Sequence, residues 1–223
     1  MQSQNNYGIK LLVKGKYALF TRPEMKVERH SYDVMTPSAA RGILEAIHWK
    51  PAIIWVIDKI EVLKPIKFQS IRRNEVKDIA STPSFNALKT KASLSEMGIF
   101  IERSRAQRAS NVLSDVAYII HAHFERTKKW GEEEKEGKHL DIFNRRARLG
   151  QCFHQPCLGT REFACDFELV EGETPAPIKD SRDLGIMLWD INHGGDKSSM
   201  FFRAKLENGV MSVPQPNSAE ILQ

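Results

Sequence analysis

The stretch TPSAARGILEAIHWKPAIIWVIDKIEVL, from Thr36 to Leu63, places a capped helix directly before a buried strand. The Thr36 hydroxyl is a typical N-cap, and Pro37 is favoured in the first turn of a helix. Pro51 ends the helix, and the segment from Ala52 to Leu63 is rich in the Ile, Val and Trp that strands favour. The helix would bury the apolar residues that repeat at helical spacing, Ala40, Ile43, Leu44 and Ile47.

Segments on both sides of this stretch predict an α+β fold. Ile9–Phe20 and Thr160–Val170 are strand-like, and apolar residues alternate from Val116 to Phe124 as in a strand. A second helix opens near Gly137, and Gly150 is placed to end it. Its narrow apolar face consists of Leu140, Phe143 and Ala147. The order strand, helix, strand, strand, helix, strand is the ferredoxin-like βαββαβ arrangement.

This first domain, residues 1–172, is expected to carry a long insertion. The segment from Ile66 to Val112 is polar and basic and shows little periodicity, apart from an expected partly helical stretch near Phe85–Leu94. Loops of this length in a compact domain are usually functional or disordered.

A small antiparallel β domain, residues 180–223, is expected after the acidic, proline-containing linker Glu171–Lys179. Its expected strands are Leu184–Ile191, Met200–Leu206 and Val210–Val213. Asn208-Gly209 is a strong hairpin-turn signal, and Gly194-Gly195-Asp196 predicts another turn.

Composition limits the classes of protein to which the chain can belong. No apolar run reaches the ~18 residues of a membrane span, and Met1–Asn6 is polar, unlike a signal peptide, so a cytoplasmic location is expected. A net charge of +5 is compatible with a polyanionic partner, or simply with solubility. Its distribution is more informative, because arginines recur in polar segments where phosphate contacts are expected. Five of them are predicted to bind the backbone of a nucleic acid: Arg72, Arg73, Arg145, Arg146 and Arg148.

The odd number of cysteines, three, favours a reducing compartment. Cys152, His154 and Cys157 are close enough in sequence to raise the question of zinc. A structural zinc site needs four ligands, usually as two close pairs, and a second pair is missing. Ordinary thiols are therefore the favoured interpretation, and no metal or other cofactor is predicted.

Histidines near the two helices are the candidates for chemistry. Gly137-Lys138-His139 opens the second helix, where free backbone N–H groups, a Lys charge and a titratable imidazole suit a phosphate. His48 lies at the end of the first helix, beside its apolar stripe. If both helices pack on one sheet face, the three side chains could share a cleft. The plainer alternatives are a solvated Lys-His pair and a histidine at the edge of the core.

A second histidine pair, His121 and His123, lies on one face of the strand from Val116 to Phe124. Such a pair could bind a metal or stack on a base. A partly exposed sheet face is preferred, because no carboxylate or third ligand lies nearby in the sequence.

Several separated motifs, in order over most of the chain, resemble the fifth CRISPR-associated family in its type I-C subtype, within the repeat-associated (RAMP) superfamily. They are Tyr17–Thr21, Ser31-Tyr32, Gly42–Pro51, Ile57-Asp58, Lys64–Ile66, Glu136–His139, Leu158–Glu162 and Glu207–Gly209. The resemblance implies a ferredoxin-like domain followed by a smaller β domain. It also implies an endoribonuclease that cuts the repeat hairpin of precursor CRISPR RNA, keeps hold of the 5′ handle and joins the other subunits of the interference complex.

The active-site residues of the family match Lys138 and His139, and its third position, commonly tyrosine, matches His48. Cleavage without a metal requires deprotonation of a 2′-OH, stabilisation of the phosphorane and protonation of the leaving oxygen. The two histidines would supply acid and base in an order that the sequence leaves open, and Lys138 would stabilise the charge. One alternative is a handle-binding subunit that does not cut. A metal-dependent DNA nuclease ranks low, because the sequence shows no carboxylate cluster for magnesium.

Overall fold

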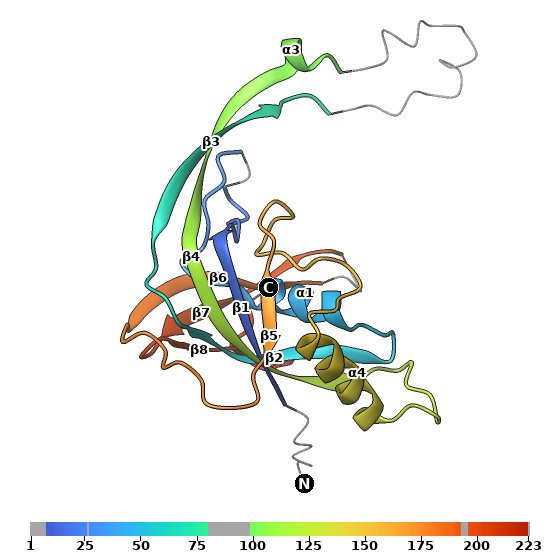
Figure 1. Cartoon of the computed structure of the whole chain (residues 1–223). Coiled ribbons are helices and arrows are strands. Elements are labelled where there is room, and N and C mark those ends of the chain that lie inside the picture. The colour runs from blue at the N-terminus through green and yellow to red at the C-terminus, as the bar shows by residue number, and fades with distance from the viewer. Residues whose placement is uncertain (1–7, 26, 80–98, 193–195, 223) are drawn as a thin grey trace, which may run out of the picture.

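The computed structural model describes residues 8–25, 27–79, 99–192 and 196–222, and its two long helices lie beside an antiparallel sheet (Figure 1). Its first half contains β1 (Ile9–Ala18), α1 (Pro37–Ile47), β2 (Ile53–Val62), β3 (Phe68–Val76), α3 (Ile101–Ser104) and β4 (Arg105–Arg126). Its second half contains α4 (Glu136–Arg148), β5 (Asp166–Leu169), β6 (Arg182–Ile191), β7 (Ser199–Leu206) and β8 (Val210–Ser212).

The main sheet has six strands in the order β5-β1-β4-β2-β8, with β3 paired to β4 off this path. Every pairing in it is antiparallel. β6 and β7 form a separate two-stranded sheet. The molecule is therefore a mixed α/β protein built mostly of antiparallel sheet, as the predicted α+β class requires.

Helix α1 begins and ends as its sequence predicts. Thr36 Oγ1 accepts a hydrogen bond from the Ala39 N–H at 3.3 Å, and Pro37 occupies the first turn. The predicted apolar stripe is buried, and His48 is the C-cap. Because this stripe faces the core, the last turn of α1 carries His48 to a fixed place beside the sheet.

Helix α4 places its narrow apolar face, with His139, Phe143 and Ala147, into the core. It ends as predicted, because Gly150 adopts a φ of +63° that few other residues tolerate. The Gln151 N–H then donates to the Arg146 carbonyl at 2.8 Å and closes the helix end. In the described residues no helix is both long and apolar enough to cross a membrane.

The described parts of the segment from Ile66 to Val112, residues 66–79 and 99–112, are not the irregular insertion that their polarity predicts. β3 pairs with β4 without interruption, from Phe68 opposite Leu113 to Val76 opposite Arg105, and this arm rises away from the rest of the molecule (Figure 1). One face of β3 is exposed and the other is only half-buried and mostly polar, so the sequence shows no apolar period. Backbone pairing and cross-strand charges stabilise it instead. The helix expected at Phe85–Leu94 lies outside the described residues.

The strand expected at Thr160–Val170 is shorter, because the chain first turns. The Phe163 N–H donates to the Thr160 carbonyl at 3.1 Å, and pairing with β1 begins only at Asp166. Gly159, with a φ of +89°, packs so tightly that a Cβ atom would lie 2.0 Å from the Leu19 carbonyl oxygen.

The predicted C-terminal strands form, with one unexpected pairing. Asn208 and Gly209 have φ values of 49° and 77° and make the predicted two-residue turn between Glu207 and Val210. β8 then pairs with β2 of the main sheet. Part of the turn expected at Gly194-Gly195-Asp196, residues 193–195, lies outside the described residues.

Candidate active site

The structure brings His48 and His139 into contact. His48 Nε2 lies 3.0 Å from His139 Nδ1, across the space between the end of α1 and the first turn of α4. Each residue is only 2% exposed. One of the two facing nitrogens must carry the hydrogen of this bond, so the two imidazoles form a dyad in which proton positions are coupled.

The backbone of His48 is held from both sides. Its N–H donates to the Leu44 carbonyl at 2.9 Å, and its carbonyl accepts from Trp55 Nε1 at 2.8 Å. Burial, together with the nearby His139 and Arg146, lowers the pKa of His48 to about 4. His48 is therefore a neutral imidazole at pH 7, which can accept a proton.

His139 is enclosed by aromatic rings and a carboxylate. The centroids of the Trp130 and Phe124 rings lie 5.5 and 6.0 Å from its own. Its Nε2 lies 3.0 Å from Glu134 Oε2, although both atoms are buried and the angle is poor for a hydrogen bond. The dyad thus extends to a carboxylate, in the order Glu134, His139, His48.

Glu134 is the site residue that sequence reasoning missed. It belongs to the run Glu132–Glu134, which is typical of a solvated acidic loop. The sequence feature that could have identified Glu134 is its position five residues before His139, near the end of the loop that leads into α4. This loop between β4 and α4, residues 127–135, also carries Trp130 and therefore covers His139.

Lys138 is close to the dyad in sequence but does not belong to it. Its side chain is exposed, whereas that of the next residue, His139, is buried. Consecutive helical residues point about 100° apart, which separates the two. Lys138 therefore places its charge on the solvent side of the first turn of α4.

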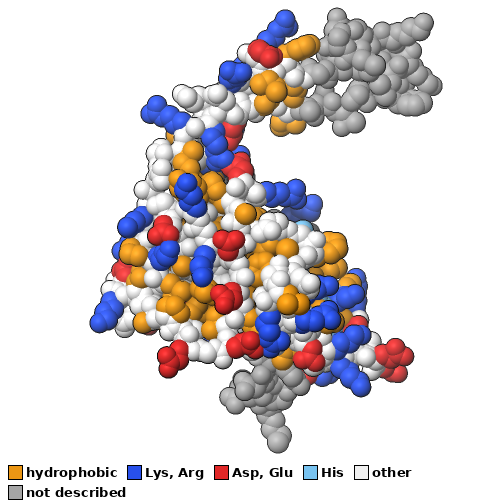
Figure 2. Space-filling view, in the orientation of Figure 1, with side chains coloured by type: hydrophobic (Ala, Val, Ile, Leu, Met, Phe, Trp, Pro, Cys, Tyr) orange, Lys and Arg blue, Asp and Glu red, His pale blue; other side chains and the backbone are white. Residues whose placement is uncertain are grey.

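The arginines after Lys138 on α4 have different surroundings. Arg146 Nη1 donates to the Ile47 carbonyl at 2.7 Å and so joins α4 to the last turn of α1. Arg148 makes two hydrogen bonds to exposed Glu171, at 2.6 and 2.9 Å. Arg145 is exposed. Figure 2 shows Lys and Arg side chains gathered over the α4 end of the molecule.

Arg72 and Arg73 lie in β3 and point to opposite faces of the arm. Arg72 is exposed, whereas Arg73 forms an ion pair with Glu162 and places its guanidinium 5.7 Å from the centre of the Phe163 ring. Arg73 thus attaches the arm to the turn at residues 160–163. The five predicted arginines are spread over three regions and do not form one patch.

His121 and His123 are partly exposed, as the sequence predicts, and their carboxylate neighbours are distant in the sequence. His121 Nε2 lies 2.8 Å from Glu61 Oε1, and His123 Nδ1 lies 2.9 Å from Asp58 Oδ1. Burial lowers the pKa of His121, whereas the hydrogen bond to Asp58 raises that of His123. Both carboxylates come from β2, the neighbouring strand. Among the described residues no group of three or more His, Cys, Asp or Glu is placed to hold a metal.

Comparison with known proteins places these features in a family. The sequence model of the Cas5d family, described as CRISPR-associated protein (Cas_Cas5), matches residues 8–214. A protein of Mannheimia succiniciproducens, named CRISPR pre-crRNA endoribonuclease Cas5d, is 52% identical over 96% of this chain and 97% of its own length. A Thermus thermophilus protein of the same name is 36% identical over 96% of this chain and 94% of its own.

Solved structures share the fold. The crystal structure of a CRISPR-associated protein superposes with a TM-score of 0.70 at 24% identity and covers 97% of this chain and 96% of that one. A Streptococcus mutans protein, SMU1763c, gives a TM-score of 0.67 at 23% identity, with 97% of each chain covered. With relatives this similar over nearly its whole length, the chain belongs to the Cas5d family of CRISPR-associated proteins.

Proposed function

We propose that the protein is a metal-independent endoribonuclease that cuts the repeat hairpin of precursor CRISPR RNA. The observation that carries the proposal is the 3.0 Å contact between His48 and His139, with Lys138 adjacent on the first turn of α4. The names of the Mannheimia and Thermus relatives support the same substrate and reaction.

In the proposed reaction, the 2′-OH of the nucleotide before the cut attacks the adjacent phosphate. Its proton passes to a general base, the P–O5′ bond breaks, and the leaving 5′ oxygen receives a proton from a general acid. The upstream fragment keeps a 2′,3′-cyclic phosphate. His48 is assigned as the base, because its lowered pKa keeps it neutral at pH 7. His139 is assigned as the acid, and Lys138 stabilises the phosphorane charge.

Access to the two histidines requires a movement on RNA binding. Both rings are 2% exposed, so a phosphate cannot reach them while the β4–α4 loop, residues 127–135, is in place. Trp130 covers His139, and the Arg126 guanidinium lies 4.9 Å from the centre of the Trp130 ring. We infer that the RNA displaces this loop, so that cleavage is coupled to binding of the correct hairpin.

We also propose a ferredoxin-like domain over residues 1–172 and a smaller β domain over residues 180–223. The strand order β5-β1-β4-β2, with α1 and α4 in the connections, supports the first. The separate β6–β7 sheet supports the second, while the pairing of β8 with β2 ties it to the first.

After cleavage we expect the protein to stay on the 5′ handle, as a cytoplasmic subunit of the type I-C interference complex. The second candidate function is a handle-binding subunit that does not cut. Burial of both histidines and the presence of His48, where the family pattern commonly has tyrosine, favour it.

Incubation of the pure protein with its own repeat RNA, with and without EDTA, separates the two functions. We expect cleavage in both conditions, and no cleavage of a substrate that carries 2′-H at the scissile nucleotide, although that substrate still binds. Binding without cleavage of the natural RNA would establish the handle-binding function. Cleavage of the deoxy substrate at a normal rate would exclude the 2′-OH as nucleophile.

A further inference from the structure

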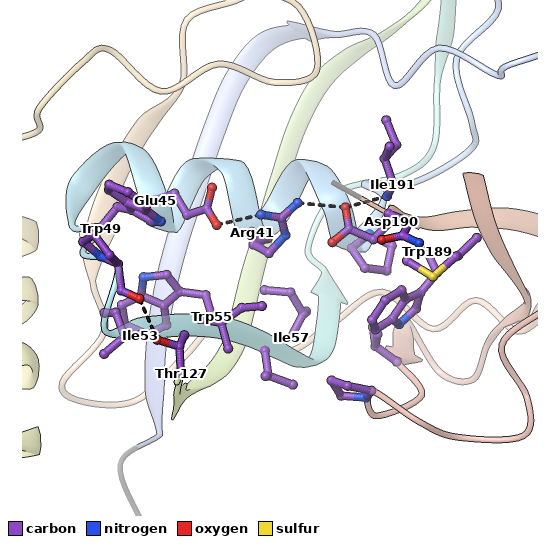
Figure 3. A pocket seen from close by; sticks show the side chains of 18 of the residues that line it. Arg41, Glu45, Trp49, Ile53, Trp55, Ile57, Thr127, Trp189, Asp190 and Ile191 are labelled. Atoms are coloured by element: carbon purple, nitrogen blue, oxygen red, sulfur yellow. Dashed lines mark hydrogen bonds and ion pairs between the residues drawn. The ribbon is translucent and has the colours of Figure 1, made fainter. Parts of the chain in front are cut away.

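A groove of about 890 Å³ runs beside α1 (Figure 3). Neither His48 nor His139 lines it, although Trp49 and the start of the β4–α4 loop do. Its floor is β2, one wall is α1 and the other is formed by the end of β6 and the start of β7. Most of the lining side chains are apolar, with Trp49 at one end and Trp189 toward the other (Figure 3). Trp49 is 55% exposed and Ile54 is 46% exposed, so the groove presents apolar side chains to solvent.

The floor of the groove is the open edge of a strand. Five consecutive residues of β2, Ile53 to Ile57, line it. Successive side chains of a strand point to opposite faces, so consecutive residues line one groove only where that groove runs along the strand edge. Among the described residues β4 pairs with this half of β2 on one side, and no strand pairs with it on the other.

Part of the backbone of this edge is available for pairing, although the Ile53 N–H already donates to the Lys50 carbonyl at 3.1 Å. The Thr127 N–H donates to the Ala52 carbonyl at 2.9 Å, so the backbone N–H and C=O groups of Ala52 point toward β4. Backbone groups alternate in direction along a strand, so those of Ile54 and Val56 point toward β4 as well. Those of Trp55 point the other way, into the groove. Unpaired strand edges are templates for another chain.

β8 already occupies the other half of the same edge. It pairs with β2 only at Lys59, Ile60 and Glu61, and its last bond runs from the Val213 N–H to the Asp58 carbonyl at 3.0 Å. Pro214 and Pro216 follow, and proline has no N–H with which to continue the ladder. The groove therefore begins where β8 leaves the sheet, and a strand in it would continue the line of β8 along β2.

We propose that this groove binds an extended, mostly apolar segment of a partner protein, which adds a strand to the free edge of β2. Main-chain hydrogen bonds to Trp55 would give affinity, and the tryptophans at the two ends would receive alternate side chains. Lys128 and Lys129 line the groove at the Ile53 end, so the segment carries an acidic side chain there. The partner is a subunit of the assembly in which we propose that the protein works, so the inference rests on the proposed function.

A protein segment fits this groove better than single-stranded RNA. RNA grooves combine stacking rings with free positive charge along the backbone path. Here Arg41 is already bound to Glu45 at 2.6 Å and to Asp190 at 2.8 Å, across the two walls (Figure 3). The only positive charge left in the lining, within the described residues, is the lysine pair at one end.

Site-specific photo-crosslinking tests the occupant. The photoreactive residue p-benzoylphenylalanine replaces Ile54 in the full chain, and the complex assembled in the native host is irradiated. The control carries the same residue in place of Ile186, which is also a strand isoleucine and is 49% exposed, outside the groove. We expect a crosslink from position 54 to an extended segment of a protein subunit, identified by mass spectrometry, and none to that segment from position 186.

Every other outcome overturns the proposal. A crosslink from position 54 to RNA would make the groove a nucleic-acid site, and no crosslink at all would leave it empty in the assembly. Cleavage by the unmodified protein is measured separately, so failure of the proposed function would not be confused with failure of this one.

A substitution then measures the contribution of the edge. Ile54→Lys should reduce affinity for the crosslinked subunit by about tenfold or more, because a charge would be placed in an apolar contact. Ile186→Lys should leave that affinity within about twofold. Thermal unfolding of both variants controls for folding, and equal effects of two folded variants would contradict the proposal.

Discussion

His48 Nε2 and His139 Nδ1 lie 3.0 Å apart in a setting that keeps water from both rings. The contact joins the C-cap of α1 to the first turn of α4. The two helices that pack on the core therefore also hold the two histidines in place. The same burial that makes the contact possible lowers the pKa of His48 to about 4. A histidine in this environment contributes to stability in a pH-dependent way.

We expect the protein to lose stability as the pH falls from about 6.5 to about 4. The pKa of His48 is near 6.5 in the unfolded chain and about 4 in the folded protein, so the unfolded state binds the proton more tightly in this window. The loss is on the order of 3 kcal/mol at full protonation. Urea unfolding at several pH values would measure it, with His48→Gln as the control. If this variant shows the same pH slope, His48 is not the titrating group.

Glu134 is expected to position His139 for proton transfer. Its carboxylate lies 3.0 Å from His139 Nε2, so Glu134→Gln should slow single-turnover cleavage by at least about tenfold and displace the pH–rate profile. RNA affinity should stay unchanged. Glu133→Gln removes the same charge from the exposed neighbour and should cut at the normal rate. Glu134→Asp should recover part of the loss, whereas an unchanged pH profile in Glu134→Gln would show that the carboxylate has no part in the chemistry.

Local rules predicted the elements that carry the site. The hydroxyl cap at Thr36, the prolines on both sides of α1 and the glycine after α4 fixed both helix ends, because each acts through backbone geometry within a few residues. The same rules placed His48 and His139 at helix ends, whereas their assignment to an active site came from the family resemblance.

Long-range pairing could not be predicted in the same way. β3 and β4 stabilise each other through backbone bonds and pairs such as Arg108 with Glu75, which leave no apolar period. Glu134 is identical in type to its two exposed neighbours, and only the position of α4 brings it to His139. The partner of Arg146, a backbone carbonyl, has no signature in a sequence.

The arginines should divide into two classes. Arg72 and Arg145 are exposed, so replacing each with Gln should weaken RNA binding and reduce the salt slope by about 0.7–0.9 for each phosphate that is no longer neutralised. Arg146→Gln should instead destabilise the fold by about 1–3 kcal/mol, because it removes the bond to the Ile47 carbonyl. Binding titrations at several salt concentrations and urea unfolding would separate the classes. An unchanged salt slope in the Arg72 and Arg145 variants would place both residues outside the RNA interface.

Substitution of His48 tests the proposed base most directly. Single-turnover cleavage by His48→Ala, with RNA saturating, should fall by at least ~10²-fold if the imidazole takes the 2′-OH proton. His48→Tyr restores the residue type common in the family, but its unperturbed pKa is ~10. It should remove the acidic limb of the pH–rate profile and keep RNA affinity. Near-normal cleavage by a folded His48→Ala variant would exclude His48 from the reaction. Lys138 and His139 would then carry the reaction alone, with His48 only covering the edge of the core.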